Sequence, residues 1–254
     1  MNKQHVNREG QSAMRMRQLT VLTDDLTATE RLVEERFGLS LCFRDPDLAR
    51  HGLRQALYPV GDQFLELVEP DGTSSAAGRL LDRRGGPCFF MAIFQVPDIG
   101  PHRARLNASG VRIVMEPTKA TWSALHMHPA DVAGVLTSID QDESMTAFSP
   151  SGPTWRDHIR TTVTDGFSSL TITTPSADDD RAAWARVLGL DPIDGVFGFD
   201  DGELRVSRDD RGADAPRSFT ITLRATDSRR DGMAIELGDT RLELGRAATG
   251  ADGE

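Results

Sequence analysis

The sequence predicts an α+β protein built from repeated βαβββ units, arranged as two tandem modules of which the second is truncated. The repeat is visible directly: the segment from Leu19 to Gly38 recurs without a gap from Leu170 to Gly189, at an offset of 151 residues. GDQFLEL, which ends at Leu67, returns as GDTRLEL, which ends at Leu244. A fold assembled from copies of one small unit is the simplest cause of such repetition.

Residues 16–142 are predicted to form the first module, which begins with one βαβββ unit. Leu19 to Thr23 alternates and is rich in Val, Leu and Thr, as a half-buried strand is. Asp24 or Asp25 can cap a helix over 29–37, which Gly38 ends. Three further strand-like runs, separated by turn residues, cover 41–44, 52–59 and 63–68.

The same pattern restarts after a connecting loop that carries Arg83 and Arg84. An apolar strand covers 89–96, and Asp98 is expected to cap a helix that ends at about Ser109, before Gly110. The next strands are predicted over 111–115, 122–128 and 134–140. This second βαβββ unit completes module 1.

Residues 143–166 lack a strand period and are predicted to be a linker, partly helical near Trp155 to Arg160. Residues 167–246 are predicted to form a degenerate module 2. Its first unit has a strand from Leu170, a helix over 177–188 and two short strands, whereas its second unit has no segment long enough for a helix. The truncation suggests that module 2 packs against module 1 in place of a homodimer partner. We therefore expect a monomer or a homodimer.

Composition restricts the class of protein and its partners. The chain has 254 residues, a formal net charge of −10 and two cysteines, Cys42 and Cys88, in apolar surroundings. The acidic balance argues against a nucleic-acid partner, and no apolar run approaches the roughly 20 residues of a membrane span. Buried free thiols suit a reducing cytoplasm, where we expect the protein to reside. Residues 1–15 and 247–254 are expected to be a flexible lead-in and a flexible tail.

Four such units in pairs, with the segments MRQLTVLTDDL, FLELVEP, FQVPDI and HMHPADVAGVLTSID, resemble the vicinal oxygen chelate superfamily. This superfamily includes glyoxalase I, methylmalonyl-CoA epimerase, extradiol dioxygenases, and bleomycin and fosfomycin resistance proteins. The resemblance covers residues 14–142 well and 167–246 weakly. It implies that two units curl into one cupped sheet, whose concave face we call the cup. In the family this face holds a divalent metal through His, Gln or Glu side chains on the first and last strands of each unit.

At the positions of the family's metal ligands, this chain has a poor set of donors. The resemblance places Gln18 and Glu66 there in the first unit, and Met91 and Ser138 in the second. A thioether does not suit Zn²⁺, Mg²⁺ or Mn²⁺, and a hydroxyl is a weak ligand. In module 2 the matching residues are Ser169, Arg205, Thr220 and Glu243. We therefore predict that the family's metal site is lost from both cups.

Glu66 is the residue that we single out as catalytic. In an apolar cup, desolvation would raise the pKa of its carboxyl and make it a general base. The alternative is a structural carboxylate that bonds to Gln18 across the sheet. Glu69 is expected on the opposite face, in solvent. Gln18, Met91 and Ser138 are expected to bind the ligand beside Glu66.

Two histidines and two aromatic residues are further candidates. His126 and His128 alternate on one strand, so their side chains share a face, and Asp131 lies nearby. This spacing suits metal ligands, but His128 can equally cap the following loop while His126 lines the cup. Trp122 and Tyr58 are expected to line the cup and stack on a planar ligand, although single aromatic residues more often belong to the core.

These residues lead to one functional hypothesis and two alternatives. The first is a glyoxalase-like protein that binds a small, largely apolar organic molecule in the cup of module 1 and acts as a lyase or isomerase with Glu66 as the base. The second is a non-catalytic binding or resistance protein that sequesters such a molecule. The third is a metal-dependent dioxygenase or glyoxalase with a rearranged site around Glu66, His126 and His128, in which a divalent metal is the cofactor.

Overall fold

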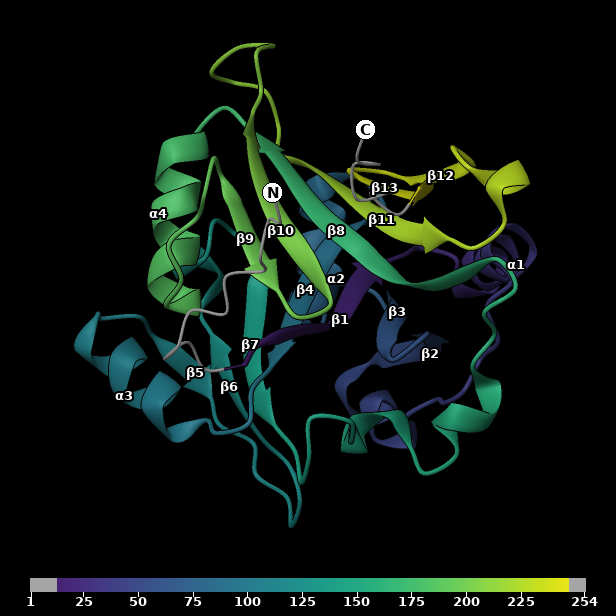
Figure 1. Cartoon of the computed structure of the whole chain (residues 1–254), viewed down its shortest axis with the longest axis horizontal. Coiled ribbons are helices and arrows are strands. Elements are labelled where there is room, and N and C mark those ends of the chain that lie inside the picture. Colours follow the sequence, from purple (N-terminus) through teal and green to yellow (C-terminus); the bar gives the residue numbers. More distant parts are fainter. Residues whose placement is uncertain (1–12, 247–254) are drawn as a thin grey trace, which may run out of the picture.

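The computed structural model describes residues 13–246, which form two β-sheets packed on one another with helices at their flanks (Figure 1). The expected lead-in and tail fall largely on residues 1–12 and 247–254, which lie outside the described residues. Arg15, at the end of the expected lead-in, already begins the first strand. Within residues 13–246 every helix is too short or too polar to cross a lipid bilayer.

Module 1 contains β1 (Arg15–Leu22), α1 (Leu26–Phe37), η1 (Pro46–His51), β2 (Leu53–Val60), β3 (Gln63–Pro70), α2 (Ala76–Arg84), β4 (Cys88–Gln95), α3 (Gly100–Ala108), β5 (Ile113–Met115), β6 (Ser123–Met127), η2 (Pro129–Asp131) and β7 (Leu136–Gln141). Its seven strands form one sheet in the order β2-β3-β1-β4-β7-β6-β5. β1 and β4 run antiparallel at the centre, and each pairs in parallel with the last strand of its own unit, β3 or β7. The two units are therefore related about the middle of the sheet, as the restarted sequence pattern predicts.

Local sequence signals set the ends of α1. The Asp25 carboxylate accepts a hydrogen bond from the Ala28 backbone N–H at 2.9 Å, and Gly38 ends the helix in the left-handed conformation at φ 66°. At α3 the expectation is wrong in detail. Ile99 is the N-cap there, and Asp98 accepts a hydrogen bond from Gly100 N–H at 2.8 Å instead.

Two further elements differ from the prediction. Residues 41–44 make only one bridge, between Phe43 and Leu57, because the chain turns into the 3-10 helix η1. Its first residue, Pro46, disfavours regular pairing just before it and suits the start of a helical turn. Arg83 and Arg84 lie in the last turn of α2, not in a loop. Ser75 caps that helix and Gly85 ends it, and both residues are typical sequence signals of helix ends.

Module 2 contains β8 (Thr164–Thr174), α4 (Ala177–Leu188), β9 (Val196–Phe199), β10 (Gly202–Arg208), β11 (Ser218–Ala225), η5 (Ser228–Arg230), β12 (Ala234–Leu237) and β13 (Thr240–Arg246). Its six strands form a second sheet in the order β12-β13-β11-β8-β10-β9. The short 3-10 turn η5 stands where a second helix would be. The structure thus confirms the α+β class, with two tandem modules of which the second is truncated.

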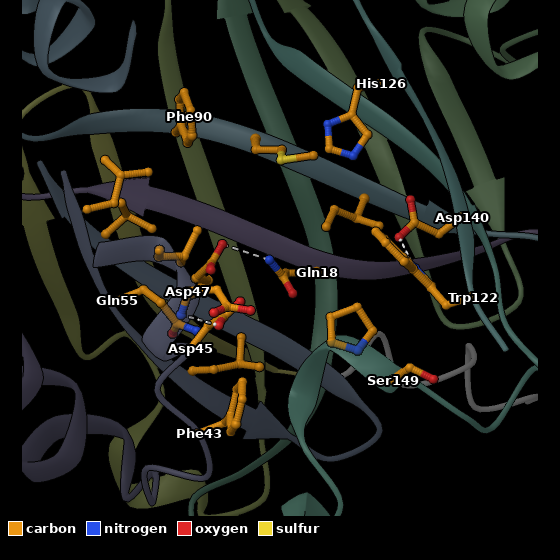
Figure 2. Close-up of a pocket in the computed structure, with 18 of the residues that line it drawn as sticks. Gln18, Phe43, Asp45, Asp47, Gln55, Phe90, Trp122, His126, Asp140 and Ser149 are labelled. Atoms are coloured by element: carbon orange, nitrogen blue, oxygen red, sulfur yellow. Dashed lines mark hydrogen bonds between the residues drawn. The ribbon is translucent and has the colours of Figure 1, made fainter. Parts of the chain in front are cut away.

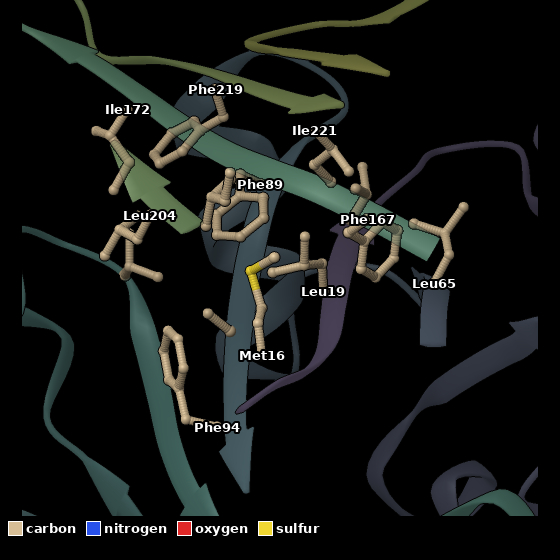
Figure 3. Packing of buried hydrophobic residues seen from close by; sticks show 14 of the residues in the cluster. Met16, Leu19, Leu65, Phe89, Phe94, Phe167, Ile172, Leu204, Phe219 and Ile221 are labelled. Atoms are coloured by element: carbon tan, nitrogen blue, oxygen red, sulfur yellow. The ribbon is translucent and has the colours of Figure 1, made fainter. Parts of the chain in front are cut away.

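The two sheets pack through their apolar faces into one core (Figure 3). Phe89 of module 1 stacks on Phe219 of module 2, with ring centroids 4.7 Å apart. Leu19 is fully buried in the same core. Because side chains alternate along a strand, its neighbours Gln18 and Thr20 point to the opposite face of the sheet. The cup of module 1 therefore opens away from module 2.

Candidate functional site

The cup of module 1 encloses a cavity of about 490 Å³ (Figure 2). Six strands of the first sheet contribute side chains to it. Three segments outside the sheet complete its rim: residues 43–48, which include the start of η1, residues 119–122, and residues 149–150 of the linker. More than half of the lining residues are apolar, and four carboxyl side chains interrupt them: Asp45, Asp47, Glu66 and Asp140.

The parallel register of β1 and β3 brings Gln18, Thr20 and Glu66 together, with Thr20 opposite Glu66. Gln18 Nε2 donates a hydrogen bond to Glu66 Oε2 at 2.8 Å, and Thr20 Oγ1 donates to the same oxygen at 2.8 Å. No residue within the described part of the chain bonds to Glu66 Oε1. The bond to Gln18 expected of a structural carboxylate is present, but it occupies only one of the two oxygens.

Burial raises the pKa of the Glu66 carboxyl to about 7. The hydrogen bonds from Thr20 and Gln18 act in the opposite sense, and the negative charge of Asp45 adds to the rise. A group with a pKa near the working pH can both take up and release a proton readily. The Glu66 side chain therefore has the electrostatic property of a general base.

A second buried carboxyl, Asp140 on β7, was not among the sequence candidates. It is 1% exposed, and its Oδ2 accepts a hydrogen bond from Trp122 Nε1 at 2.8 Å while its Oδ1 accepts one from Ser138 Oγ. Burial raises the pKa of Asp140 to about 7, against the effect of these two bonds. The signal was available, because Asp140 follows Ser138 by two residues on a strand and so shares its face.

The second βαβββ unit supplies one side of the cavity, where Figure 2 shows His126, Trp122 and Asp140 grouped together. Trp122 lies in the wall, and its bond to Asp140 fixes the plane of the indole. Met91 is also part of the wall. Ser138 differs from the expectation: it is fully buried beneath the wall and bonds to Asp140 rather than to the cavity.

The two histidines have different roles. His126 lines the cavity, burial lowers its pKa, and its ring nitrogens have no hydrogen-bond partner among residues 13–246. His128 does not face the ligand space, since its Nδ1 accepts a hydrogen bond from Ala130 N–H at 3.1 Å and caps η2. Asp131 is paired with Arg112 at 2.7 Å. The structure therefore does not bring His126, His128 and Asp131 together as a ligand set.

Tyr58 does not line the cavity, which corrects the sequence expectation. It is fully buried in the main core, and its hydroxyl donates a hydrogen bond to Glu34 of α1 at 3.0 Å. Its neighbour Leu57 takes the position on the cavity side. One step along β2 reverses the face, and a single sequence shows the alternation without showing which face is concave.

Tyr58→Phe should lower the free energy of unfolding by up to about 1 kcal/mol, because it removes the hydrogen bond from the buried hydroxyl to the exposed Glu34 carboxylate and keeps the ring in the core. It should not change the binding of small aromatic probes in the cup. Urea denaturation and probe titration measure the two effects. A large loss of probe affinity would place Tyr58 in the ligand site after all.

The linker closes one end of the cup through an aromatic cluster. Phe148 and Trp155 pack on Phe64 of β3, with ring centroids 4.8 and 5.0 Å from it. The guanidinium of Arg17, which is fully buried, lies 5.1 to 5.6 Å from the centroids of all three rings. Cation–π attraction and ring packing thus hold residues 148–155 on module 1, so that Ser149 and Pro150 reach the rim of the cavity.

The donor set at the family's metal position does not fit a divalent ion. Such an ion needs three or four converging N or O donors. Gln18 and Glu66 can each still offer one oxygen, but Met91 offers a thioether and the Ser138 hydroxyl is bonded to Asp140, so only two of the four positions supply a suitable donor. Among residues 13–246 no three His, Cys, Asp or Glu side chains are grouped as a metal site.

The corresponding face of module 2 carries ion pairs along its strands. Arg205 pairs with Glu203, and Arg241 bridges Glu236 and Glu243. Glu243, the one acidic residue at a metal-ligand position there, is thus neutralised by a neighbouring arginine at 2.8 Å. Module 1 consequently offers the better-formed site.

Solved structures similar to this chain include some that match about half of it and one that matches most of it. Methylmalonyl-CoA epimerase in complex with methylmalonyl-CoA and NH4+ is 25% identical over 52% of this chain and 97% of its own, with a TM-score of 0.46. The epimerase from Mycobacterium tuberculosis is 23% identical over 54% of this chain and 91% of its own, with a TM-score of 0.45. Each of these covers about one module.

A hypothetical protein from Staphylococcus aureus matches across both modules. It covers 91% of this chain and 99% of its own length with a TM-score of 0.63, at 12% identity, which shows a shared two-module fold. A search of curated proteins found no match. A family model described as the glyoxalase-like domain matches residues 19–188, more than half of the sequence, and the chain therefore belongs to the glyoxalase-like domain family.

Proposed function

We propose that module 1 binds a small, largely apolar carbonyl compound and acts as an isomerase or lyase, with Glu66 removing a proton from the carbon next to the carbonyl. One observation carries this proposal: the Glu66 carboxyl lies in the cavity wall with Oε2 held by two donors and Oε1 left for a substrate. Its pKa of about 7 suits proton transfer in both directions near neutral pH.

The proposed step balances within this site. The ionised Glu66 takes the proton on Oε1, and the electron pair of the broken C–H bond moves onto the carbonyl oxygen as an enolate. Return of the proton from Glu66 to another carbon of a conjugated enolate, on the same face, gives an isomer, and loss of a leaving group from the next carbon gives an elimination product. Gln18 and Thr20 donate to Oε2 and hold the carboxyl in place.

His126 is the best-placed donor for the enolate oxygen. Burial lowers its pKa, so that the ring is neutral near pH 7 and carries one N–H. That N–H has no acceptor among the described residues, and the side chain lies in the cavity wall. Removing a single positioned donor of this kind from an oxyanion hole costs other enzymes about 3 kcal/mol of transition-state stabilisation.

The test is a proton-exchange assay in D₂O. The protein is incubated with a panel of small ketones, aldehydes and thioesters, and loss of the α-proton signal is followed by ¹H NMR. We expect the exchange rate to rise about tenfold per pH unit below pH 7 and to level off above about pH 8, because only the ionised form of a base with a pKa of about 7 is active.

Three controls make the result decisive. Heat-unfolded protein corrects for buffer catalysis, and chelator-treated protein excludes adventitious metal. Glu66→Gln should lose the exchange activity. Saturable binding of a carbonyl compound without any exchange would contradict catalysis and favour the sequestering alternative, and exchange that persists in Glu66→Gln would exclude this residue as the base.

A further inference from the structure

The charge around the cavity is unbalanced in favour of acidic groups. Asp47 is paired with Arg50, but Asp45, Glu66 and Asp140 have no ion-pair partner among residues 13–246. The cavity lining also includes one basic side chain, Lys119, whose ammonium lies 5.9 Å from the centroid of the Trp122 ring, on the other side of the cavity. The side of the cavity formed by β2, β3 and η1 therefore carries unpaired negative charge.

Hydrogen-bond acceptors without donors gather on that same side. Gln55 on β2 is 5% exposed and lies in the cavity wall, and its side-chain Oε1 is buried without a hydrogen-bond partner. Asp45 lines the same cavity (Figure 2), and among residues 13–246 its Oδ1 accepts a hydrogen bond only from the Asp47 backbone N–H, at 2.8 Å. Glu66 Oε1 also lacks a partner within the described residues. A buried acceptor without a donor is rare in folded proteins and points to a group that binds there.

Asp45 and Glu66 lie close enough in the cavity wall to affect each other's ionisation. The negative charge of Asp45 disfavours ionisation of Glu66, so the two carboxyls interact across the cavity wall. A positive group placed between them would relieve this repulsion. Nearby arginines do not fill this role, because Arg44 pairs with Glu30 at 2.6 Å and Arg54 pairs with Glu69 at 2.6 Å.

We infer that the cup selects ligands with a protonated nitrogen, whose N–H groups bond to Asp45 and Gln55 on the same side of the cavity as Glu66, while the apolar part of the ligand packs against Phe43 and Met91. An ammonium group has several N–H donors and no hydrogen-bond acceptor, so it complements a cavity wall in which acceptors lack donors. The inference rests on the proposed function in one respect, the placement of the ligand in this cup. It narrows the substrate class to amino-substituted carbonyl compounds.

The chemistry of the proposed step is consistent with such a substrate. A cation beside Glu66 favours its ionised form, which is the form that accepts a proton. An ammonium group close to the carbonyl also withdraws electron density and makes the α-proton more acidic. The positive charge of the ammonium group would thus both strengthen binding and assist removal of the α-proton.

The experiment compares three probes with the same ring: tryptamine, which is cationic, tryptophol, which is neutral, and indole-3-acetate, which is anionic. Isothermal titration at pH 8 should give a Kd for tryptamine at least tenfold lower than for tryptophol, with indole-3-acetate weakest. Asp45→Asn, which keeps the capping oxygen of η1, should reduce the tryptamine preference at least fivefold. Gln55→Leu should weaken tryptamine more than tryptophol.

A matched control separates local from overall charge. Asp82→Asn removes the same charge on the exposed face of α2, outside the cavity, and should leave the preference unchanged. Equal affinity for tryptamine and tryptophol, preference for indole-3-acetate, absence of saturable binding, or an unaltered preference in Asp45→Asn would each overturn the inference. If the protein prefers the ammonium probe but catalyses no proton exchange, the inference on ligand charge stands and only the catalytic role of Glu66 is contradicted.

Discussion

Glu66→Gln should slow proton exchange by a factor of about 10² to 10⁴ and, at pH 8, raise the free energy of unfolding by up to about 3 kcal/mol. The loss of activity follows because an amide cannot accept the proton. The gain in stability follows from burial, which raises the pKa of this carboxyl from 4.5 to about 7. Ionised Glu66 is therefore a cost to the folded state at pH 8, and the neutral amide removes that cost.

The stability effect has a defined pH window. The folded-state pKa of Glu66 lies above its unfolded value, so the group favours folding fully below about pH 4.5, and this contribution is lost as the pH rises through 7. At pH 4.5 the variant and the wild type should differ by less than about 1 kcal/mol, since the acid and the amide are both neutral there. Urea denaturation at pH 4.5, 6 and 8 measures the divergence.

Glu69→Gln provides the matched control on the same strand. Glu69 points to the other face, where its Oε2 accepts the Leu26 backbone N–H at 2.8 Å and its Oε1 pairs with Arg54. This corrects the expectation that Glu69 is merely solvated. Glu69→Gln should leave proton exchange unchanged and lower stability slightly. If Glu66→Gln instead destabilises the protein at pH 8, the stability prediction is wrong and the ionised carboxylate stabilises the folded sheet, whereas the exchange assay decides its catalytic role.

Gly238→Ala should destabilise the protein by at least about 2 kcal/mol more than Gly232→Ala. Both glycines have positive φ, 59° and 78°, so alanine meets the same backbone strain at each. They differ in surroundings. A Cβ on Gly238 would lie 1.9 Å from the Pro87 carbonyl oxygen of module 1, whereas a Cβ on Gly232 meets nothing within 4 Å.

The difference in unfolding free energy between the two variants reports how closely module 2 packs against module 1 at this contact. To avoid the clash, the turn between β12 and β13 must move away from the start of β4. That movement breaks the hydrogen bond from Phe89 N–H to Asp239 at 2.8 Å and disturbs the Phe89–Phe219 stack. Urea denaturation of both variants gives the difference, with the integrity of the fold checked by far-UV circular dichroism. Equal destabilisation would mean that the modules are not held together at this contact.

The sequence by itself determined most of the secondary elements and their repetition, since these depend on neighbours along the chain, although it missed α2 and predicted a strand over residues 41–44. Asp25 and Gly38 mark the ends of α1 through local hydrogen bonds and backbone preference, and alternation reveals the strands. The pairing of Gln18 with Glu66 was also within reach, because the first and last strands of a unit are adjacent in this repeated fold.

Only the tertiary structure decided which groups meet in the cup. Tyr58 was assigned to the wrong face of β2, because alternation is symmetric until a second sheet and a helix cover one side. Asp45 and Gln55 reach the cavity through the turn of η1 and the pairing of β2 with β3, and Asp140 through its place in β7. These are contacts between distant segments, and the same contacts desolvate the carboxyls that give the site its chemistry.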